Sequence, residues 1–234
     1  MDIEIGPAHP YQPIPNGFFL INPTTVIMSW IIIGAVAVLI FMVGLRLSRR
    51  PGRLQVAIEM FVDALDNLCK STLGDRGRRY LPFIGSLFLF VWISNIIGII
   101  PGLEEPTRDA NTPIGLMAVS IITAHVSSIR VKGMKEYIKE YFEPGLRIRG
   151  KWMPNVLLAP LNIIGECGKA ISMSFRLFGN IFGGGIIIVV ISSLVSFVGV
   201  PPFLHLFLGL FVGTIQALVF SMLALTYTAV ATSH

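Results

Sequence analysis

A run of twenty uncharged, mainly apolar residues at positions 26–45 constrains the fold more than any other feature of this sequence. An α-helix rises about 1.5 Å per residue, so twenty residues cross the roughly 30 Å hydrocarbon core of a bilayer. Pro23 and two threonines precede the run and favour the start of a helix there. The sequence therefore predicts a membrane-spanning helix at 26–45.

Three further regions are apolar enough to lie in a membrane, at residues 81–100, 113–128 and 152–234. Val200-Pro201-Pro202 divides the last region into two helices, each longer than the roughly twenty residues that a perpendicular crossing needs. Only 13% of all residues are charged, about half the share found in soluble domains. We therefore predict an all-α integral membrane protein with about five membrane crossings and two long, tilted C-terminal helices.

The basic residues indicate how the chain lies across the membrane. Of the 18 lysines and arginines, eight lie at 46–79 and seven at 130–151, between apolar regions. Basic loops stay in the cytoplasm, so five crossings place the N-terminus outside and the C-terminus inside. Because the basic residues lie in loops between spans, the net charge of +5 does not indicate binding of nucleic acid.

Between positions 53 and 73, apolar residues recur at helical spacing with three acidic residues among them. This pattern predicts an amphipathic helix at the membrane interface that is too polar to cross. We predict a single membrane domain at 1–234. Its parts are an external segment at 1–25, a first span at 26–45, a cytoplasmic loop with the amphipathic helix at 46–80, second and third spans at 81–128, a cytoplasmic loop at 129–151 and a long helical hairpin at 152–234.

Arg176 is the residue in the last apolar region that most clearly indicates function. An arginine keeps its positive charge in proteins, and a charge inside a membrane usually faces a cavity or a partner. Such a charge can attract a carboxylate of a neighbouring protein and block a cation between two aqueous pockets. The alternatives are that Arg176 extends to the interface or pairs with Glu166.

Polar side chains surround Arg176 on one face of its helix. At about 100° per residue, the following side chains lie within roughly 40° of it: Asn162, Lys169, Ser172 and Asn180. This stripe fits either a water-lined path or hydrogen bonds between helices. On the last helix, His205 and Gln216 are eleven residues apart, close to three turns, so they should share a face.

Four segments of the chain resemble one family. Residues 174–180 (S-F-R-L-F-G-N) are similar to the R-L-F-G-N signature of subunit a of bacterial F-type ATP synthases. Residues 95–102 (N-I-I-G-I-I-P-G), 106–112 (P-T-R-D-A-N-T) and 216–220 (Q-A-L-V-F) resemble further segments of that family in the same order. The resemblance covers about residues 15–232, and it implies that the chain lies in the bacterial inner membrane.

The resemblance implies a non-catalytic subunit that forms two offset half-channels beside a ring of c subunits. It implies subunit b, other ATP synthase subunits and membrane lipid as partners, and no cofactor. Arg176 matches the arginine that stops ions from short-circuiting between the half-channels. Near the outer half-channel the matching residues are Asn180, Gln216, Asp109 and Asn111, and on the inner side they are Ser128, Asn162, Glu166 and Lys169.

The chain departs from the family at two positions of the outer half-channel. Many proton-using members carry Glu nine residues after the arginine and His seven residues before the glutamine, where this chain has Gly185 and Gly209. His205 lies one turn before Gly209 and is a candidate to replace that histidine. The translocated ion is therefore left open between H⁺ and Na⁺, and the resemblance favours H⁺.

Two other function classes are less consistent with the sequence. A self-contained secondary ion transporter with a broken-helix site usually has an internal repeat, and none is visible here. An intramembrane enzyme needs paired carboxylates, a metal cluster or a nucleophile with its base, whereas Glu166 is alone and the histidines are dispersed. The sequence also has no phosphate-binding loop of the G-x-x-x-x-G-K-[ST] type, so we expect ATP chemistry on other subunits.

Overall fold

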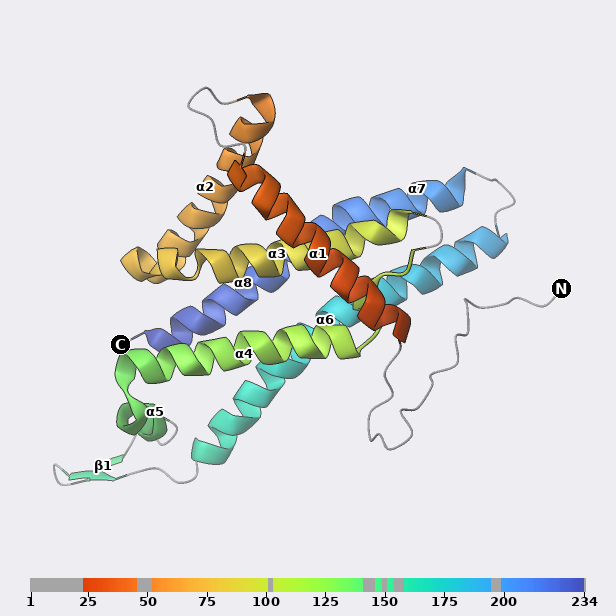
Figure 1. Ribbon diagram of the computed structural model, residues 1–234. Helices are drawn as coiled ribbons and strands as arrows, with labels where there is room; N and C mark the ends of the chain where they lie inside the picture. Colours follow the sequence, from red (N-terminus) through yellow and green to blue (C-terminus); the bar gives the residue numbers. More distant parts are fainter. Residues whose placement is uncertain are drawn as a thin grey trace.

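The computed structural model describes residues 23–45, 52–100, 103–140, 146–148, 151–153, 158–194 and 199–233. Most of the predicted external segment at 1–25 therefore lies outside the described residues. Figure 1 shows the helices in their spatial arrangement. They are α1 (Pro23–Leu45), α2 (Arg53–Leu73), α3 (Leu81–Ile96), α4 (Asn111–Lys132), α5 (Met134–Glu140), α6 (Leu158–Leu194), α7 (Val200–Leu206) and α8 (Gly213–Thr232).

Short segments of other geometry connect these helices. Three 3₁₀ turns lie at Gly74–Arg79, Ile97–Ile99 and Pro106–Arg108, and a π-helical segment, Phe207–Val212, joins α7 to α8. A small antiparallel hairpin pairs β1 (Leu146–Ile148) with β2 (Lys151–Met153), and Leu146 lies opposite Met153. The predicted all-α class is confirmed, and this hairpin in the loop after α5 is a minor addition to it.

Five helices of the described chain are long and apolar enough to cross a membrane, as predicted. They cover Pro23–Met42, Leu81–Ile99, Asn111–Lys132, Pro160–Leu194 and Val200–Thr232. The last two are 35 and 33 residues long, well beyond the roughly twenty residues of a perpendicular crossing. In Figure 1, α6 runs obliquely past α4, as expected for an over-long span that must tilt. The chain is therefore a multi-pass membrane protein.

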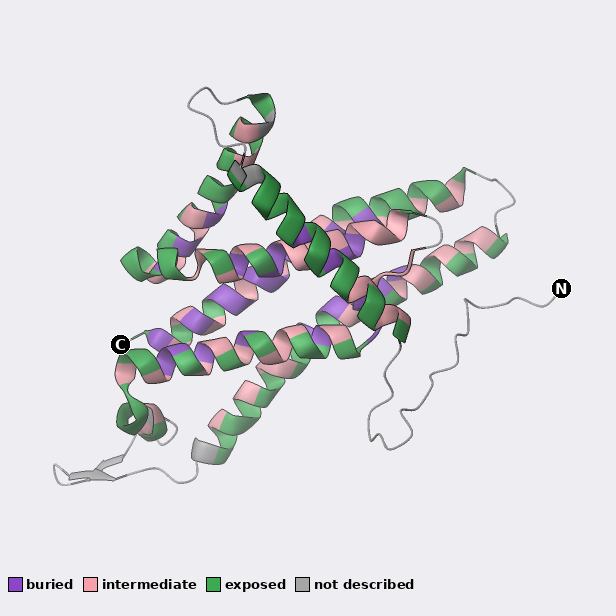
Figure 2. Cartoon of the chain, in the orientation of Figure 1, coloured by how far each residue is buried: buried purple, intermediate pink, exposed green. Residues whose placement is uncertain are grey.

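The amphipathic helix α2 occupies the predicted residues, Arg53–Leu73. It leaves the end of α1 at a sharp angle and returns toward the start of α3 (Figure 1). Figure 2 shows that much of α2 is exposed, while Leu65 and Cys69 on one side are buried. One apolar face thus packs against the bundle. Glu59 and Asp63 are exposed, whereas Asp66 is partly buried and pairs with Lys70.

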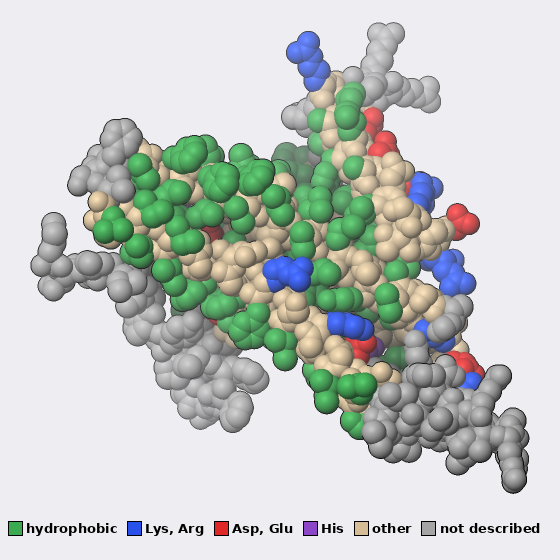
Figure 3. All heavy atoms as spheres, turned by 180° about the vertical axis from the view of Figure 1, so that it is seen from behind, with side chains coloured by type: hydrophobic (Ala, Val, Ile, Leu, Met, Phe, Trp, Pro, Cys, Tyr) green, Lys and Arg blue, Asp and Glu red, His purple; other side chains and the backbone are tan. Residues whose placement is uncertain are grey.

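The core lies where α3, α6 and α8 meet. Its fully buried side chains include Val91 of α3, Leu177 of α6 and Phe220 of α8, all at most 1% exposed. Ala217 and Ala224 are also fully buried in α8, and small residues of this kind let neighbouring helices approach closely. The outer surface is the reverse of a soluble protein, because the face shown in Figure 3 is mainly hydrophobic with few charged side chains.

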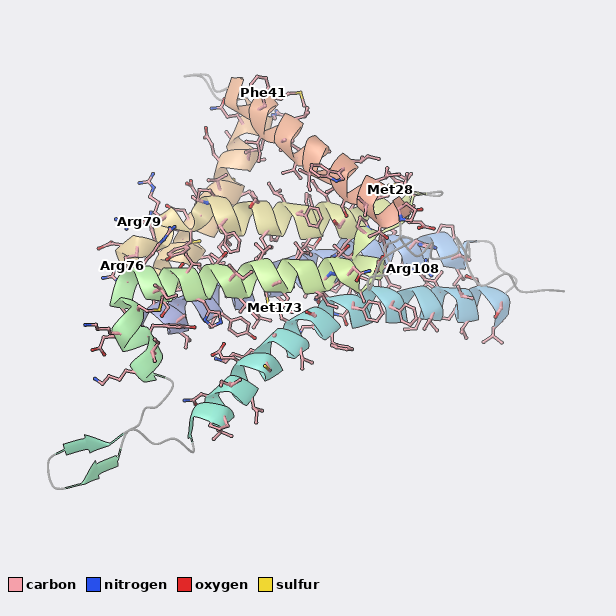
Figure 4. The ribbon with its side chains drawn as sticks, turned by 60° about the horizontal axis from the view of Figure 1, so that its bottom comes forward. Met28, Phe41, Arg76, Arg79, Arg108 and Met173 are labelled. Carbon is pink, nitrogen blue, oxygen red and sulfur yellow. The ribbon has the colours of Figure 1, made fainter. Side chains whose placement is uncertain are left out.

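The two ends of the bundle differ in charge. Arg76 and Arg79 lie at the end of the bundle where α5 and the C-terminal end of α8 also lie, whereas Arg108 lies at the opposite end (Figure 4). The acidic residues Glu104 and Glu105 belong to the same loop as Arg108, between α3 and α4. The described parts of the two basic blocks therefore share one end, which is what five crossings require.

Candidate functional site

Arg176 lies near the middle of α6 with its side chain exposed. Met173 and Leu177, on a neighbouring face of the helix, are 1% and 0% exposed and hold α6 against the bundle. No carboxylate of the described residues forms an ion pair with Arg176. Glu166 is instead bonded to Lys169, so it is not the partner of Arg176 in this structure. The guanidinium is thus available to a group outside the chain.

Small residues lie on the helix surface beside Arg176. Ser172 is exposed one turn before it, and Gly179 and Gly183 follow on the same side. At both glycines, a Cβ atom would meet no other atom within 4 Å. Glycine and serine at such positions allow another helix to approach the backbone closely.

A hydrogen bond joins α6 to α8 one turn after Arg176. The side-chain Nδ2 of Asn180 donates to Oε1 of Gln216 over 2.7 Å. Gln216 is 3% exposed, and its own Nε2 has no acceptor among the described residues. A buried amide donor without a protein partner usually bonds an ordered water, so this place is a candidate for water held between the two helices.

A cavity of about 120 Å³ opens at the acidic end of the bundle, on the side of Asn180. Its walls come from the loop before α4, from α6, and from α7 with the π-helical segment. Its polar side chains are Glu104, Glu105, Arg108, Asn180 and His205. A volume of this size holds several water molecules. Carboxyl, imidazole and amide groups around water form a path that either a proton or a small cation can use.

Glu105 is the acidic side chain most closely enclosed at this cavity. Its carboxyl group rests on the backbone of Gly98, so closely that a Cβ atom at that position would overlap Oε1, Cδ and Cγ of Glu105. Burial raises the pKa of Glu105 to about 7, and the nearby Arg108 lowers it only in part. Between its ordinary pKa of 4.5 and about 7, the folded chain therefore keeps a proton on Glu105 that an exposed glutamate would release.

Gly185 and Gly209 also line this cavity. A Cβ atom on Gly185 would lie 3.7 Å from Nη2 of Arg108, an ordinary contact, so a side chain fits there. At Gly209 a Cβ atom would lie 2.6 Å from Cγ1 of Ile99 and 3.3 Å from the Asn95 carbonyl oxygen. A side chain at 209 would therefore require the side chain of Ile99 to move.

His205 and Gln216 are not related by the simple helical spacing that the sequence predicts. Residues 207–212 between them form a π-helical segment, so the rotation per residue of an α-helix does not apply across it. His205 is exposed and lines the cavity, whereas Gln216 is buried against Asn180. His205 thus belongs to the cavity wall, and Gln216 belongs to the contact between α6 and α8.

Asp109 and Asn111 lie beside the cavity, and neither is among the residues that line it. Asp109 is 9% exposed, accepts a hydrogen bond from the hydroxyl of Thr25 over 3.1 Å, and accepts another from the backbone N–H of Asn111. These bonds join α1 to the start of α4. In this structure, therefore, the observed contacts of Asp109 are structural.

The residues predicted for the inner side lie on α4 and on the first half of α6. Nζ of Lys169 is 2.7 Å from Oε1 of Glu166, and the same ammonium lies 6.0 Å from the ring centre of Tyr227. Ser128 of α4 is 1% exposed, and its hydroxyl has no partner among the described residues. Asn162 is half-buried and has a partner.

The sequence interpretation missed three residues of the outer site: Asn95, Glu105 and Arg108. Asn95 is fully buried in α3, donates to the carbonyl oxygen of Gly213 over 3.2 Å, and accepts from the hydroxyl of Thr107 over 2.9 Å. Asn95 therefore holds the acidic loop against α8. An amide within an apolar span was the available signal, because buried polar residues in membranes usually bond a neighbouring helix.

Among the described residues, no group of three or more His, Cys, Asp or Glu side chains could hold a metal ion. The titratable lining of the cavity consists of two carboxyl groups, one guanidinium and one imidazole. Proton exchange and transient cation passage are the chemistry that such a set supports.

Comparison with known proteins agrees with this arrangement. The family model of the ATP synthase A chain matches residues 26–229. ATP synthase subunit a of Moorella thermoacetica is 35% identical over 206 residues, which cover 88% of this chain and 89% of the relative. The protein of the same name from Syntrophobacter fumaroxidans is 34% identical, with 96% of this chain and 90% of the relative covered. ATP synthase subunit a 1 of Syntrophotalea carbinolica is 35% identical, with 90% and 85% covered. Because these matches extend along most of the sequence, we conclude that the chain belongs to the ATP synthase subunit a family.

Proposed function

We infer that this chain is the ion-translocating stator subunit a in the membrane sector of a rotary F-type ATP synthase. Its family and its multi-pass helical fold support a non-catalytic membrane subunit that works with other ATP synthase subunits. The finer proposal is that two offset half-channels carry ions to and from a c-ring. Subunit b and membrane lipid cover other parts of the outer surface.

The observation that carries this proposal is the exposed guanidinium of Arg176 on an apolar helix, which forms no ion pair with any residue in the described part of the chain. A charge at this depth costs several kcal/mol unless a partner or water compensates it. A carboxylate of a rotating ring would compensate it transiently. The surface formed by Ser172, Gly179 and Gly183 leaves room for ring helices to pass closely. Because arginine does not lose its proton, the same charge repels any cation that would leak between the half-channels.

The cavity beside Asn180 supports an outer half-channel. It lies at the end of the bundle opposite Arg76 and Arg79, and basic loops face the cytoplasm. We therefore place the N-terminus outside and the C-terminus in the cytoplasm of a bacterial inner membrane. The inner half-channel would pass Ser128, Asn162 and the Glu166–Lys169 pair. Protons are the favoured ion, with Na⁺ as the alternative.

The test is ATP-driven ion pumping in membrane vesicles that contain the assembled complex. Arg176→Ala should abolish pumping while the complex still assembles, because the ring carboxylate loses its partner and ions leak between the half-channels. Arg130→Ala is the matched control, since Arg130 is an exposed arginine in the last turn of α4. Added Na⁺ identifies the ion. Tightly coupled pumping by Arg176→Ala would refute the stator role and favour a self-contained transporter.

A further inference from the structure

We propose that Glu105 is the proton-exchanging carboxyl group of the outer cavity and does there what a glutamate at position 185 would do. This inference deepens the proposed function and rests on it. It concerns a loop residue that lies outside the membrane-spanning helices, 80 positions before Gly185 in the sequence.

The position of the carboxyl group is the first argument. Glu105 reaches the cavity from the loop between α3 and α4, and its carboxyl group lies directly on the backbone of Gly98. Asn95 fixes this loop from the other side through its bond with Thr107. The carboxyl group therefore lies against the 3₁₀ turn that follows α3, and the bond between Thr107 and Asn95 fixes its loop, so the group does not extend freely into solvent.

The charges around Glu105 are the second argument. The other titratable groups that line the cavity are Glu104 and Arg108 from the same loop and His205 from α7. Burial disfavours the charged carboxylate, and Arg108 only partly offsets this effect, so the pKa of Glu105 rises to about 7. A carboxyl group that titrates near neutral pH exchanges protons efficiently in both directions.

Arg108 lies near both Glu105 and Gly185, the position at which many proton-using family members carry glutamate. Its guanidinium nitrogens and carbon lie 3.7 to 3.9 Å from the place where a Cβ atom of residue 185 would be. A carboxylate on a side chain at 185 would thus point into the same cavity and face the same guanidinium. One acidic group beside Arg108 is present in either arrangement, and here the loop supplies it.

The proton balance of the proposed step is simple. A hydronium ion on the outer side gives its proton to the Glu105 carboxylate, which leaves one water molecule and a neutral carboxylic acid. The acid then gives the same proton to a water molecule in the cavity on the side of Asn180, and the carboxylate is restored. The proton moves on toward the ring carboxylate that faces Arg176. His205 lines the same cavity.

The experiment measures ATP synthesis by the whole complex in proteoliposomes whose interior corresponds to the outer side. The interior is set at pH values from about 5.5 to about 8.5, and the total driving force is kept constant with a potassium diffusion potential. The wild-type rate should fall as the interior pH passes about 7, because protonated Glu105 becomes scarce.

Glu105→Gln should lower the rate of ATP synthesis about tenfold and remove the fall of the rate near pH 7. This loss is smaller than is typical of an acid–base group, because cavity water still conducts protons. Glu105→Asp should keep a fall of the rate with interior pH, but the midpoint pH of that fall should shift. Adding Gly185→Glu to Glu105→Gln should restore much of the rate, since position 185 has room beside Arg108. Glu136→Gln, which removes an exposed carboxylate from α5 at the opposite end, should leave both rate and profile unchanged.

The proposal is overturned if Glu105→Gln retains the wild-type rate and pH profile, or if synthesis needs Na⁺ in the interior and ignores its pH. If Glu105→Gln does not assemble, an unchanged midpoint in Glu105→Asp overturns it equally. Arg176→Ala separates this inference from the proposed function. Uncoupling by Arg176→Ala together with a silent Glu105→Gln would refute the role of Glu105 alone.

Discussion

Gly98→Ala should lower the pKa of Glu105 with little effect on assembly. The new methyl group would overlap the carboxyl end of Glu105, which is the mobile end of a flexible side chain and can move away toward solvent. Burial now holds the pKa at about 7 instead of 4.5. At about 1.4 kcal/mol per pKa unit, ionising Glu105 therefore costs about 3 kcal/mol more than ionising an exposed glutamate. Most of this extra cost should disappear once the carboxyl group is exposed to water.

Difference infrared spectroscopy of the purified complex measures this change directly. The carbonyl stretch of protonated Glu105 is the band present in wild type and absent from Glu105→Gln. In wild type it should titrate near pH 7, and in Gly98→Ala it should titrate closer to 4.5. Gly185→Ala is the matched control, because it adds a methyl group to the same cavity at an ordinary contact distance. An identical midpoint in Gly98→Ala and wild type would show that the contact with Gly98 does not set the pKa.

Three further substitutions test other parts of the structure. Asn180→Ala removes the bond to Gln216 and should reduce ATP-driven pumping severalfold without loss of assembly, and an unchanged rate would argue against a role for this pair. Asn95→Ala removes two buried hydrogen bonds and should destabilise the complex by about 1–3 kcal/mol, seen as a lower temperature of dissociation; no shift would contradict the role of Asn95 as an anchor. Gly209→Ala should impair assembly more than Gly185→Ala, since only the former overlaps Ile99, and equal yields of complex would refute this packing argument.

The helices could be predicted because apolar length and polar periodicity are local properties of the sequence. The predicted amphipathic helix matches α2 at both ends, and the predicted span at 113–128 lies inside α4. The hairpin of β1 and β2 was not predicted, since each of its strands has only three residues. The π-helical segment was not predicted either, because contacts such as those of Gly209 with Asn95 and Ile99 join distant parts of the chain and leave no local pattern in the sequence.

The candidate site was predictable only where one residue suffices. Arg176 stands out in an apolar helix by itself, and its exposure in the structure is consistent with that prediction. Glu105 does not stand out, because it is one of several acids in a polar loop, and its burial follows from the contact with Gly98. Which loop residue reaches a cavity depends on the folding of α3 against α6 and α8, and a single sequence carries no local signal for this.

The π-helical segment at Phe207–Val212 sets how far α7 is rotated relative to α8 about the axis of the last span. A π-turn contains one residue more than an α-turn, so the span carries one surplus position between α7 and α8. If the segment became regular α-helix with all its residues kept, α7 would rotate by about 100° relative to α8. His205 would then leave the cavity, while the bond between Asn180 and Gln216 could persist. The surplus residue thus sets the angular offset between the histidine at the outer end of this span and the glutamine at its middle.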